Sequence, residues 1–113
     1  MYPSGPWKGF WHQDIHGRQP MEQFELHFAT DGTITGRGVD MVGLFFFRGT
    51  CHTTTGQLTM TKQYVGKHAV EYVGRSDGEG RIVGTWSIYG ITTGPFSLHP
   101  VLRGDEPIQE IVK

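Results

Sequence analysis

The chain has 113 residues, of which 36% are hydrophobic and 12% aromatic, and a formal net charge of −1 with its six histidines counted as neutral. This length fits one compact domain, and the near-zero charge argues against a nucleic-acid partner, which usually requires a basic balance. No apolar run approaches the roughly 20 residues that cross a bilayer as a helix, so we expect no membrane partner. The single cysteine, Cys51, excludes an internal disulfide, and no signal peptide is visible, so we expect a cytoplasmic protein.

Short segments in which polar and apolar residues alternate predict a protein made of β-strands. The clearest case is the range 21–30, where Phe24, Leu26 and Phe28 alternate with polar residues. Turns are marked by glycine, as at Asp31-Gly32, and the polar range 12–20 is predicted to be a loop. In chain order, the predicted strands are 5–11, 21–30, 33–40, 43–50, 57–65, 68–74, 81–89 and 93–99.

The order of these strands predicts the fold. They follow one another without a helix or a long crossover, which indicates an all-β, eight-stranded antiparallel up-and-down barrel in residues 1–100, followed by a tail, 101–113. Closing the sheet into a barrel also removes exposed edge strands. Among the 17 glycines, Gly36 and Gly38 fall inside a predicted strand, as expected where a small barrel bends strongly.

Short motifs carry a resemblance to known barrels. Gly5-x-Trp7 resembles the opening of lipocalin and avidin-type (calycin) barrels, and the hairpin around Asp31-Gly32 is similar to the second hairpin of streptavidin-like proteins. The motif Gly84-x-Trp86-x-Ile88 looks like their inward tryptophan near the end of the barrel. The opening from Tyr2 to Trp11 also resembles a group of short bacterial proteins of unassigned function. The avidin-type resemblance implies a small-ligand pocket at one open end, although the residues that hold biotin have no counterparts here.

Alternation also places polar side chains on the inward face of the barrel. In the hairpin that turns at Gly66-Lys67, Lys62 and Tyr64 share a face, as do His68 and Tyr72. Burying an ionised group costs several kcal/mol unless it is paired, so either these groups satisfy one another, with Asp40 pairing to Lys62, or they face a ligand. The predicted ligand-binding residues are Trp7, Trp11, Asp40, Phe45, Lys62, Tyr64, His68, Tyr72 and Trp86.

These residues favour a small barrel that binds a small apolar or aromatic ligand in its interior or mouth. One alternative is a cofactor-free isomerase or cyclase in which the interior Asp, Lys, Tyr and His groups move a proton. Another is a protein-interaction module with a solid core. No cofactor is indicated. The range His12-x-Asp14-x-His16 has metal-ligand residue types but lies in a predicted loop without a second ligand pair, so no metal site is predicted.

The outer face of the predicted barrel carries apolar residues that indicate a contact surface. Leu44 and Phe46 point outward from one strand, with Val39 and Val65 outward in its neighbours. An exposed apolar patch usually marks an interaction site, so we expect a homodimer or a docking surface for another protein. Alternatively, the tail covers this patch through an Ile108/Ile111 pair.

Overall fold

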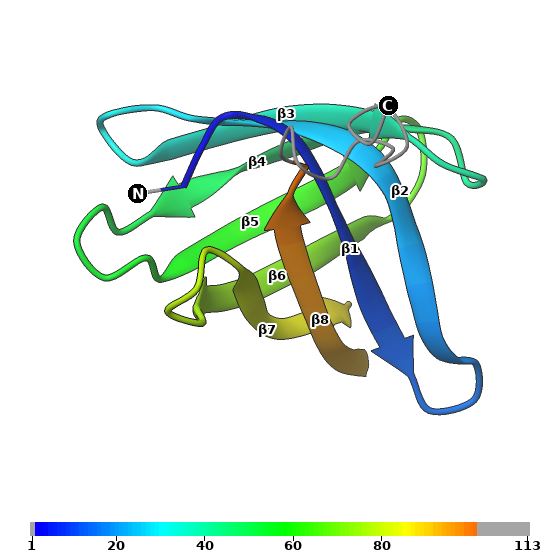
Figure 1. The fold of residues 1–113 in the computed structure, drawn as a ribbon. Coiled ribbons are helices and arrows are strands. Elements are labelled where there is room, and N and C mark those ends of the chain that lie inside the picture. The colour runs from blue at the N-terminus through cyan, green and yellow to red at the C-terminus, as the bar shows by residue number, and fades with distance from the viewer. Residues whose placement is uncertain (1, 102–113) are drawn as a thin grey trace, which may run out of the picture.

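The computed structural model describes residues 2–101, which form a closed barrel of eight antiparallel strands (Figure 1). Each strand pairs with the next along the chain, and β1 pairs with β8 to close the barrel. The strands are β1 (Gly5–Gln13), β2 (Gly17–Phe28), β3 (Thr33–Val39), β4 (Leu44–Cys51), β5 (Leu58–Tyr64), β6 (Ala69–Ser76), β7 (Ile82–Ile88) and β8 (Thr92–Pro100). The predicted up-and-down barrel is confirmed.

Across residues 2–101 there is no helix long and apolar enough to cross a bilayer. The predicted tail contact through Ile108 and Ile111 lies outside the described residues.

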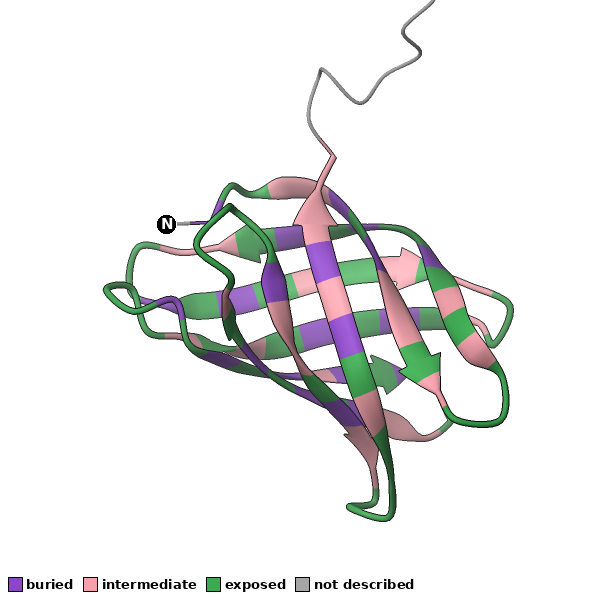
Figure 2. Cartoon of the chain, turned by 60° about the horizontal axis from the view of Figure 1, so that its bottom comes forward, coloured by how far each residue is buried: buried purple, intermediate pink, exposed green. Residues whose placement is uncertain are grey.

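Alternation along each strand decides which side chains fill the barrel. In β5, Leu58, Met60, Lys62 and Tyr64 are all buried, while Thr59 between them is exposed. Figure 2 shows the same interleaving of buried and exposed positions along the other strands. Because the inward set is almost entirely apolar, hydrophobic burial in the barrel interior is the main force that holds the sheet closed.

One end of the barrel is closed by aromatic side chains, because the segment before β1 folds over it. Tyr2 is buried, and its hydroxyl donates a hydrogen bond to the Gly56 carbonyl over 2.6 Å. Its ring lies 6.0 Å from that of Trp7 and 5.3 Å from that of Phe28, measured between centroids. The Trp7 indole N–H donates to the Pro3 carbonyl over 2.9 Å. The first predicted strand begins at residue 5, and nothing in the sequence predicted this plug.

The first hairpin is longer than the sequence predicted. The range 12–20 was predicted to be a loop, which is wrong: β1 continues to Gln13 and β2 begins at Gly17. Breakers at Gly17 and Pro20 misled the prediction. Pro20, which has no backbone N–H, is tolerated in β2 because β3 pairs only with the range Glu25 to Phe28 of that strand. The edge of β2 that faces β3 is therefore unpaired at Pro20 and needs no N–H donor.

This hairpin projects from the barrel as a two-stranded ribbon. Beyond Trp11, β1 no longer pairs with β8, and before Glu25, β2 has no pairing to β3. Figure 1 shows the ribbon extending past the other strands at the end remote from the N-terminus. That end is therefore only partly walled by the sheet, which leaves room for an opening.

Candidate ligand-binding site

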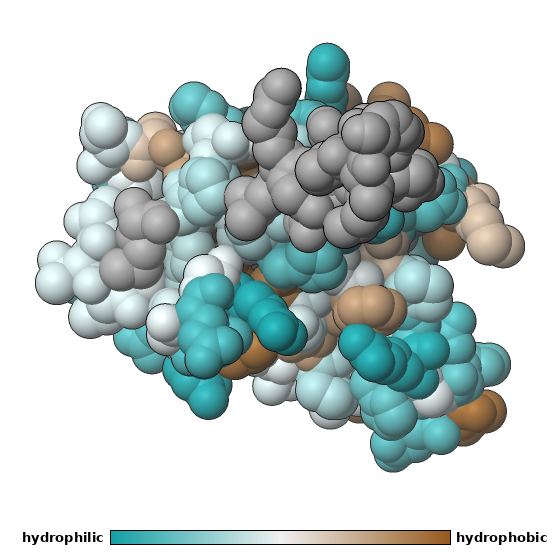
Figure 3. Space-filling model, viewed as in Figure 1, coloured by the Kyte–Doolittle hydropathy of each residue, from teal (hydrophilic) through white to brown (hydrophobic). Residues whose placement is uncertain are grey.

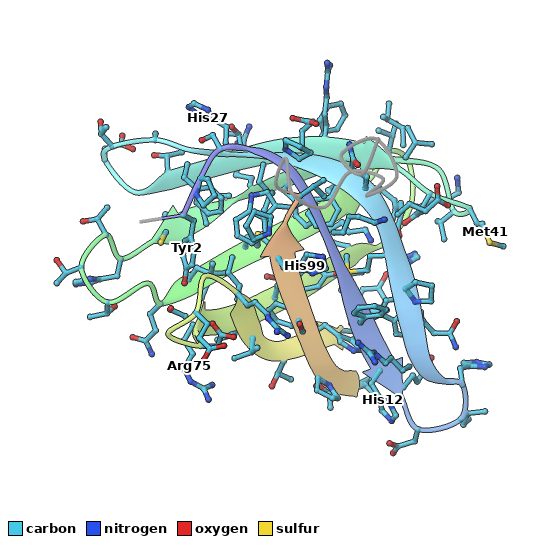
Figure 4. All side chains as sticks on the ribbon, viewed as in Figure 1. Tyr2, His12, His27, Met41, Arg75 and His99 are labelled. Carbon is cyan, nitrogen blue, oxygen red and sulfur yellow. The ribbon has the colours of Figure 1, made fainter. Side chains whose placement is uncertain are left out.

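A cavity of about 420 Å³ occupies the end of the barrel remote from Tyr2. Its walls come from all eight strands or their adjoining loops, with the β1–β2 ribbon on one side of the mouth and the β3–β4 loop on another. Figure 4 places Met41 of that loop at this end and Tyr2 at the opposite end. The lining side chains are mostly apolar or aromatic: Trp11, Pro20, Met21, Phe24, Met41, Val42, Phe45, Tyr64, Val70, Tyr72, Trp86 and Ile88. The polar ones are Gln13, Gln19, Glu22, Asp40, Lys62, His68 and Thr92.

Two tryptophans form one wall of the cavity and are held rigidly. The rings of Trp11 and Trp86 meet edge to face, with centroids 5.7 Å apart and planes at 88°. The Trp86 indole N–H donates to the His12 carbonyl over 3.1 Å, and His12 belongs to the part of β1 that β8 does not pair. This bond satisfies a backbone acceptor at the seam and fixes the orientation of the wall.

A polar cluster lies opposite, formed by Asp40, Lys62 and Tyr64. The Lys62 ammonium is 3.3 Å from the Asp40 Oδ2 atom, and the Tyr64 hydroxyl donates to that same oxygen over 2.6 Å. Lys62 is the one charged residue buried among those described, at 6% exposure. Its Nζ also lies 4.5 Å from the centre of the Phe45 ring, within the range of a cation–π contact. Paired in this way, the buried charge is tolerated in an otherwise apolar interior.

Asp40 reaches this cluster from a turn, and not from a strand as predicted. β3 ends at Val39, and Asp40 opens a tight turn in which its backbone exchanges hydrogen bonds with Gly43. The Val42 N–H donates to the Asp40 Oδ1 atom over 2.9 Å, which leaves Oδ2 for Lys62 and Tyr64. His68 was also predicted in a strand, but β6 begins at Ala69. Turn geometry, and not strand alternation, therefore points these two side chains inward.

The electrostatics of the cluster depend on the balance between burial and pairing. Burial acts to raise the pKa of Asp40, but the Tyr64 hydrogen bond and the Lys62 charge outweigh it and hold that pKa below its ordinary value. Burial lowers the pKa of Lys62, and the nearby carboxylate only partly offsets this. Burial, reinforced by Asp40, raises the pKa of both Tyr64 and Tyr72. Asp40 is therefore ionised and both phenols are neutral near pH 7.

The lowered pKa of Asp40 predicts acid sensitivity. A carboxyl whose pKa is lower in the folded state stabilises the fold above its unfolded value, near 3.8, and this stabilisation is lost as the pH falls through the folded value. We expect the free energy of unfolding to drop as the pH falls below about 4, through the lowered pKa of Asp40. The drop should be smaller in Asp40→Asn, which cannot titrate. Urea unfolding at several pH values measures this, and equal drops in the two proteins would contradict it.

The structure brings eight of the nine predicted ligand-binding residues to the cavity: Trp11, Asp40, Phe45, Lys62, Tyr64, His68, Tyr72 and Trp86. Trp7 is the exception. It is fully buried at the closed end against Tyr2 and Phe28, so its assignment to the site was wrong. Alternation correctly puts Trp7 and Trp11 on one face, but four residues separate them by about 13 Å along a strand.

Sequence reasoning missed the residues of the mouth. Gln13 and Gln19 come from the range 12–20, which was predicted to be a loop. Met21 begins the predicted strand 21–30 but was not assigned to the site, and Met41 and Val42 come from the β3–β4 loop. The alternation of Gly17, Gln19 and Met21 with Arg18, Pro20 and Glu22 was the available signal for the ribbon. No sequence signal was available for Met41 and Val42, because the direction of their side chains depends on the turn that Asp40 begins.

The predicted outward residues form a continuous surface, here called the wall patch: Val39, Leu44, Phe46 and Val65. Val39 pairs with Leu44 across β3 and β4, and the Val65 N–H donates to the Leu44 carbonyl over 3.0 Å. Phe46 is 47% exposed and Leu44 44%. The patch therefore lies on the outside of the barrel, beside the mouth of the cavity.

Comparison with known proteins adds no relative. No protein-family model, no curated protein and no solved structure matches the chain. The resemblance to streptavidin-like barrels stays a prediction. The function is therefore inferred from the chemistry of the residues that line the cavity. Within residues 2–101, no group of three or more His, Cys, Asp or Glu side chains converges as a metal site would.

Proposed function

We propose that this protein binds a small apolar or aromatic ligand in the open end of its barrel. The observation that carries the proposal is the cavity of about 420 Å³, walled by aromatic rings and furnished with one polar cluster. Small-molecule sites usually combine apolar walls with a few convergent polar groups in a volume of this order. The closed end, by contrast, is filled by Tyr2, Trp7 and Phe28.

The polar cluster supports a ligand without net charge that carries an oxygen acceptor. Asp40 and Lys62 neutralise each other, and Glu22, the other acidic side chain of the lining, is exposed to solvent, so a charged ligand would lack a buried counterion in the cavity. The Lys62 ammonium has three N–H donors, and its contact with Asp40 occupies one of them. The remaining donors and the Tyr72 hydroxyl are suited to a carbonyl or hydroxyl oxygen of the ligand, while Trp11 and Trp86 cover its apolar part.

Filling the cavity tests the proposal. N-phenyl-1-naphthylamine, a neutral aromatic probe whose emission rises in apolar surroundings, should bind the wild type saturably. In Val70→Trp, an indole would occupy the cavity, so we expect the dissociation constant to rise about tenfold or more. Val73→Trp is the matched control, because Val73 lies on the same strand, β6, but faces outward and is 57% exposed. Fluorescence titration measures both.

Two outcomes would contradict the proposal: no saturable binding by the wild type, or equal binding by Val70→Trp and the wild type. Circular dichroism and thermal unfolding check that each variant is folded. Native mass spectrometry of the purified protein complements the titration, since a retained ligand appears as added mass.

A second candidate function is protein interaction through the wall patch. Its side chains are contiguous across β3, β4 and the turn that follows β5, and they remain substantially exposed, which favours a contact surface. A homodimer through this patch is our proposal for the partner, and the native mass spectrum that reports a ligand also reports the dimer. The cofactor-free isomerase or cyclase ranks below both, because the Asp40 carboxylate is already held by four donor groups and is a weak base. The cytoplasm stays the proposed compartment, supported by the free Cys51.

A further inference from the structure

The hairpins around the cavity mouth carry five exposed apolar side chains, four of which project almost fully into solvent. They are Ile15 at the tip of the β1–β2 ribbon, Met41 and Val42 in the β3–β4 loop, and Tyr89 and Ile91 between β7 and β8. We call these five the mouth rim. Met41 is 97% exposed, Ile15 85%, Ile91 84% and Tyr89 79%. The fourth hairpin at this end contributes Val65 of the adjoining wall patch.

The opposite end of the barrel has a different composition. Its loops, 29–32, 52–57 and 77–81, contain only small and polar residues such as Asp31, His52, Asp77 and Glu79. Within the described residues, every loop position that exposes a large apolar side chain lies at the mouth end. Figure 3 shows brown groups toward the right, where the mouth lies, and white to teal tips at the left. Random surface exposure would not segregate apolar tips in this way.

Tyr89 provides a second, independent observation. Its backbone φ is +56°, the only positive value among the described non-glycine residues, and Gly90 follows with +68°. Such a two-residue turn favours Asn-Gly or Gly-Gly, and a bulky residue in the left-handed region costs of order 1 kcal/mol. The strained residue is a tyrosine at the tip of a hairpin, where its side chain is exposed and does not pack in the core. Backbone strain of this kind is typical of positions kept for a function.

We propose that the mouth rim docks on the surface of a lipid bilayer, so that the cavity exchanges its apolar ligand directly with the membrane. This inference rests on the proposed function and adds the source of the ligand. The sequence predicted no membrane partner, because no segment can span a bilayer. Surface docking needs only a few apolar tips that enter the interfacial region, with tyrosine at the boundary between apolar and polar phases.

The shape and charge of the rim favour a bilayer over a protein partner. Its tips stand apart around an opening, and all but Val42 are nearly fully exposed, which suits insertion into a fluid phase more than close packing against a rigid surface. The wall patch, with half-exposed contiguous side chains, has the opposite character. The loops that carry the rim contribute Asp14, His16 and the paired Asp40, and the neighbouring turn contributes Lys67 and His68. No strong charge of one sign therefore selects anionic lipids.

Co-sedimentation with phosphatidylcholine vesicles, which carry no net charge, tests the proposal. The variant Ile15→Ser/Tyr89→Asn/Ile91→Ser removes three rim side chains that do not line the cavity and places asparagine where φ is positive. We expect the wild type to partition into the vesicle pellet at both low and high salt, and the variant to partition about tenfold less. Val73→Ser, which removes an exposed apolar side chain from β6 away from the rim, should sediment like the wild type.

Each other result overturns the proposal. Failure of the wild type to sediment, equal sedimentation of the triple variant, or binding that high salt abolishes would each exclude apolar docking by the rim. If the wild type self-associates without vesicles and the triple variant is monomeric by sedimentation velocity, the rim is a contact between copies instead. Titration with N-phenyl-1-naphthylamine in solution separates this result from the proposed function: the triple variant should bind the probe as the wild type does.

Discussion

Replacing Gly84 by alanine is expected to destabilise the barrel by about 3 kcal/mol or more, which is a large share of the 5–15 kcal/mol typical of a domain. Gly84 of β7 lies opposite Gly74 of β6. A methyl group on Gly84 would meet the Val73 carbonyl oxygen and the Gly74 Cα atom, closer than real atoms approach. Both are backbone atoms, so they cannot move aside without separating the two strands, and a closed barrel has no free edge to absorb that shift.

Gly78→Ala is the matched control for this prediction. Gly78 lies in the β6–β7 turn with a φ of +87°, and a methyl group there would meet no atom within 4 Å. Its substitution carries only the conformational cost of a side chain at positive φ, about 1 kcal/mol. Urea unfolding followed by circular dichroism compares the two. Similar midpoints for Gly84→Ala and Gly78→Ala would show that the strands are not packed as closely as described.

The buried Lys62–Asp40 pair is expected to respond unequally to the loss of either partner. In Asp40→Asn, the Lys62 ammonium loses its counterion while buried, so we expect a loss of about 3 kcal/mol. In Lys62→Met, Asp40 keeps the bonds from Tyr64 and Val42 and is partly exposed, so the loss should be about 1 kcal/mol or less. The double variant should recover most of the loss caused by Asp40→Asn, because no buried charge then remains.

The pH dependence of Asp40→Asn provides a check on this cycle. Burial lowers the pKa of Lys62, and removing the carboxylate removes the charge that opposes this lowering. Between the folded and the unfolded pKa of a buried lysine, the unfolded chain holds the proton and the folded chain does not. Folding must then release that proton, and the free energy that this costs falls as the pH rises. The stability of Asp40→Asn should therefore rise with pH between the lowered folded pKa of Lys62 and its ordinary value of 10.5. Equal losses in the two single variants would contradict the unequal response, and no recovery in the double variant would contradict the pairing.

Most of the fold was predictable because strand alternation is a local property. Phe24 and Leu26 alternate with polar residues in the sequence, which predicts that they face inward, and both are buried. The prediction failed where local breakers misled it: Gly17 and Pro20 indicated a loop, but β2 passes through both. Whether a proline fits in a strand depends on which edge lacks a partner, and only the assembled sheet decides that.

The residues of the candidate site that lie in strands were also predictable from alternation. Lys62, Tyr64, Tyr72 and Trp86 follow from alternation in strands and line the cavity. Alternation predicts which face a residue occupies, but it does not predict how far along the barrel axis the residue lies. Trp7 was therefore placed in the site, although it lies at the closed end. The mouth rim was also missed, since exposed apolar residues in separate turns have no pattern in the chain.

The sequence by itself determined the strand order and the inward face of each strand, because alternation acts between neighbours in the chain and each hairpin joins consecutive segments. Only the tertiary structure decided which end of the barrel is plugged and which is open. That difference arises from long-range contacts: Tyr2 bonds to Gly56 at one end, while the β1–β2 ribbon outruns its partners at the other. Such contacts depend on strand lengths and registers around the whole barrel, which no local segment contains.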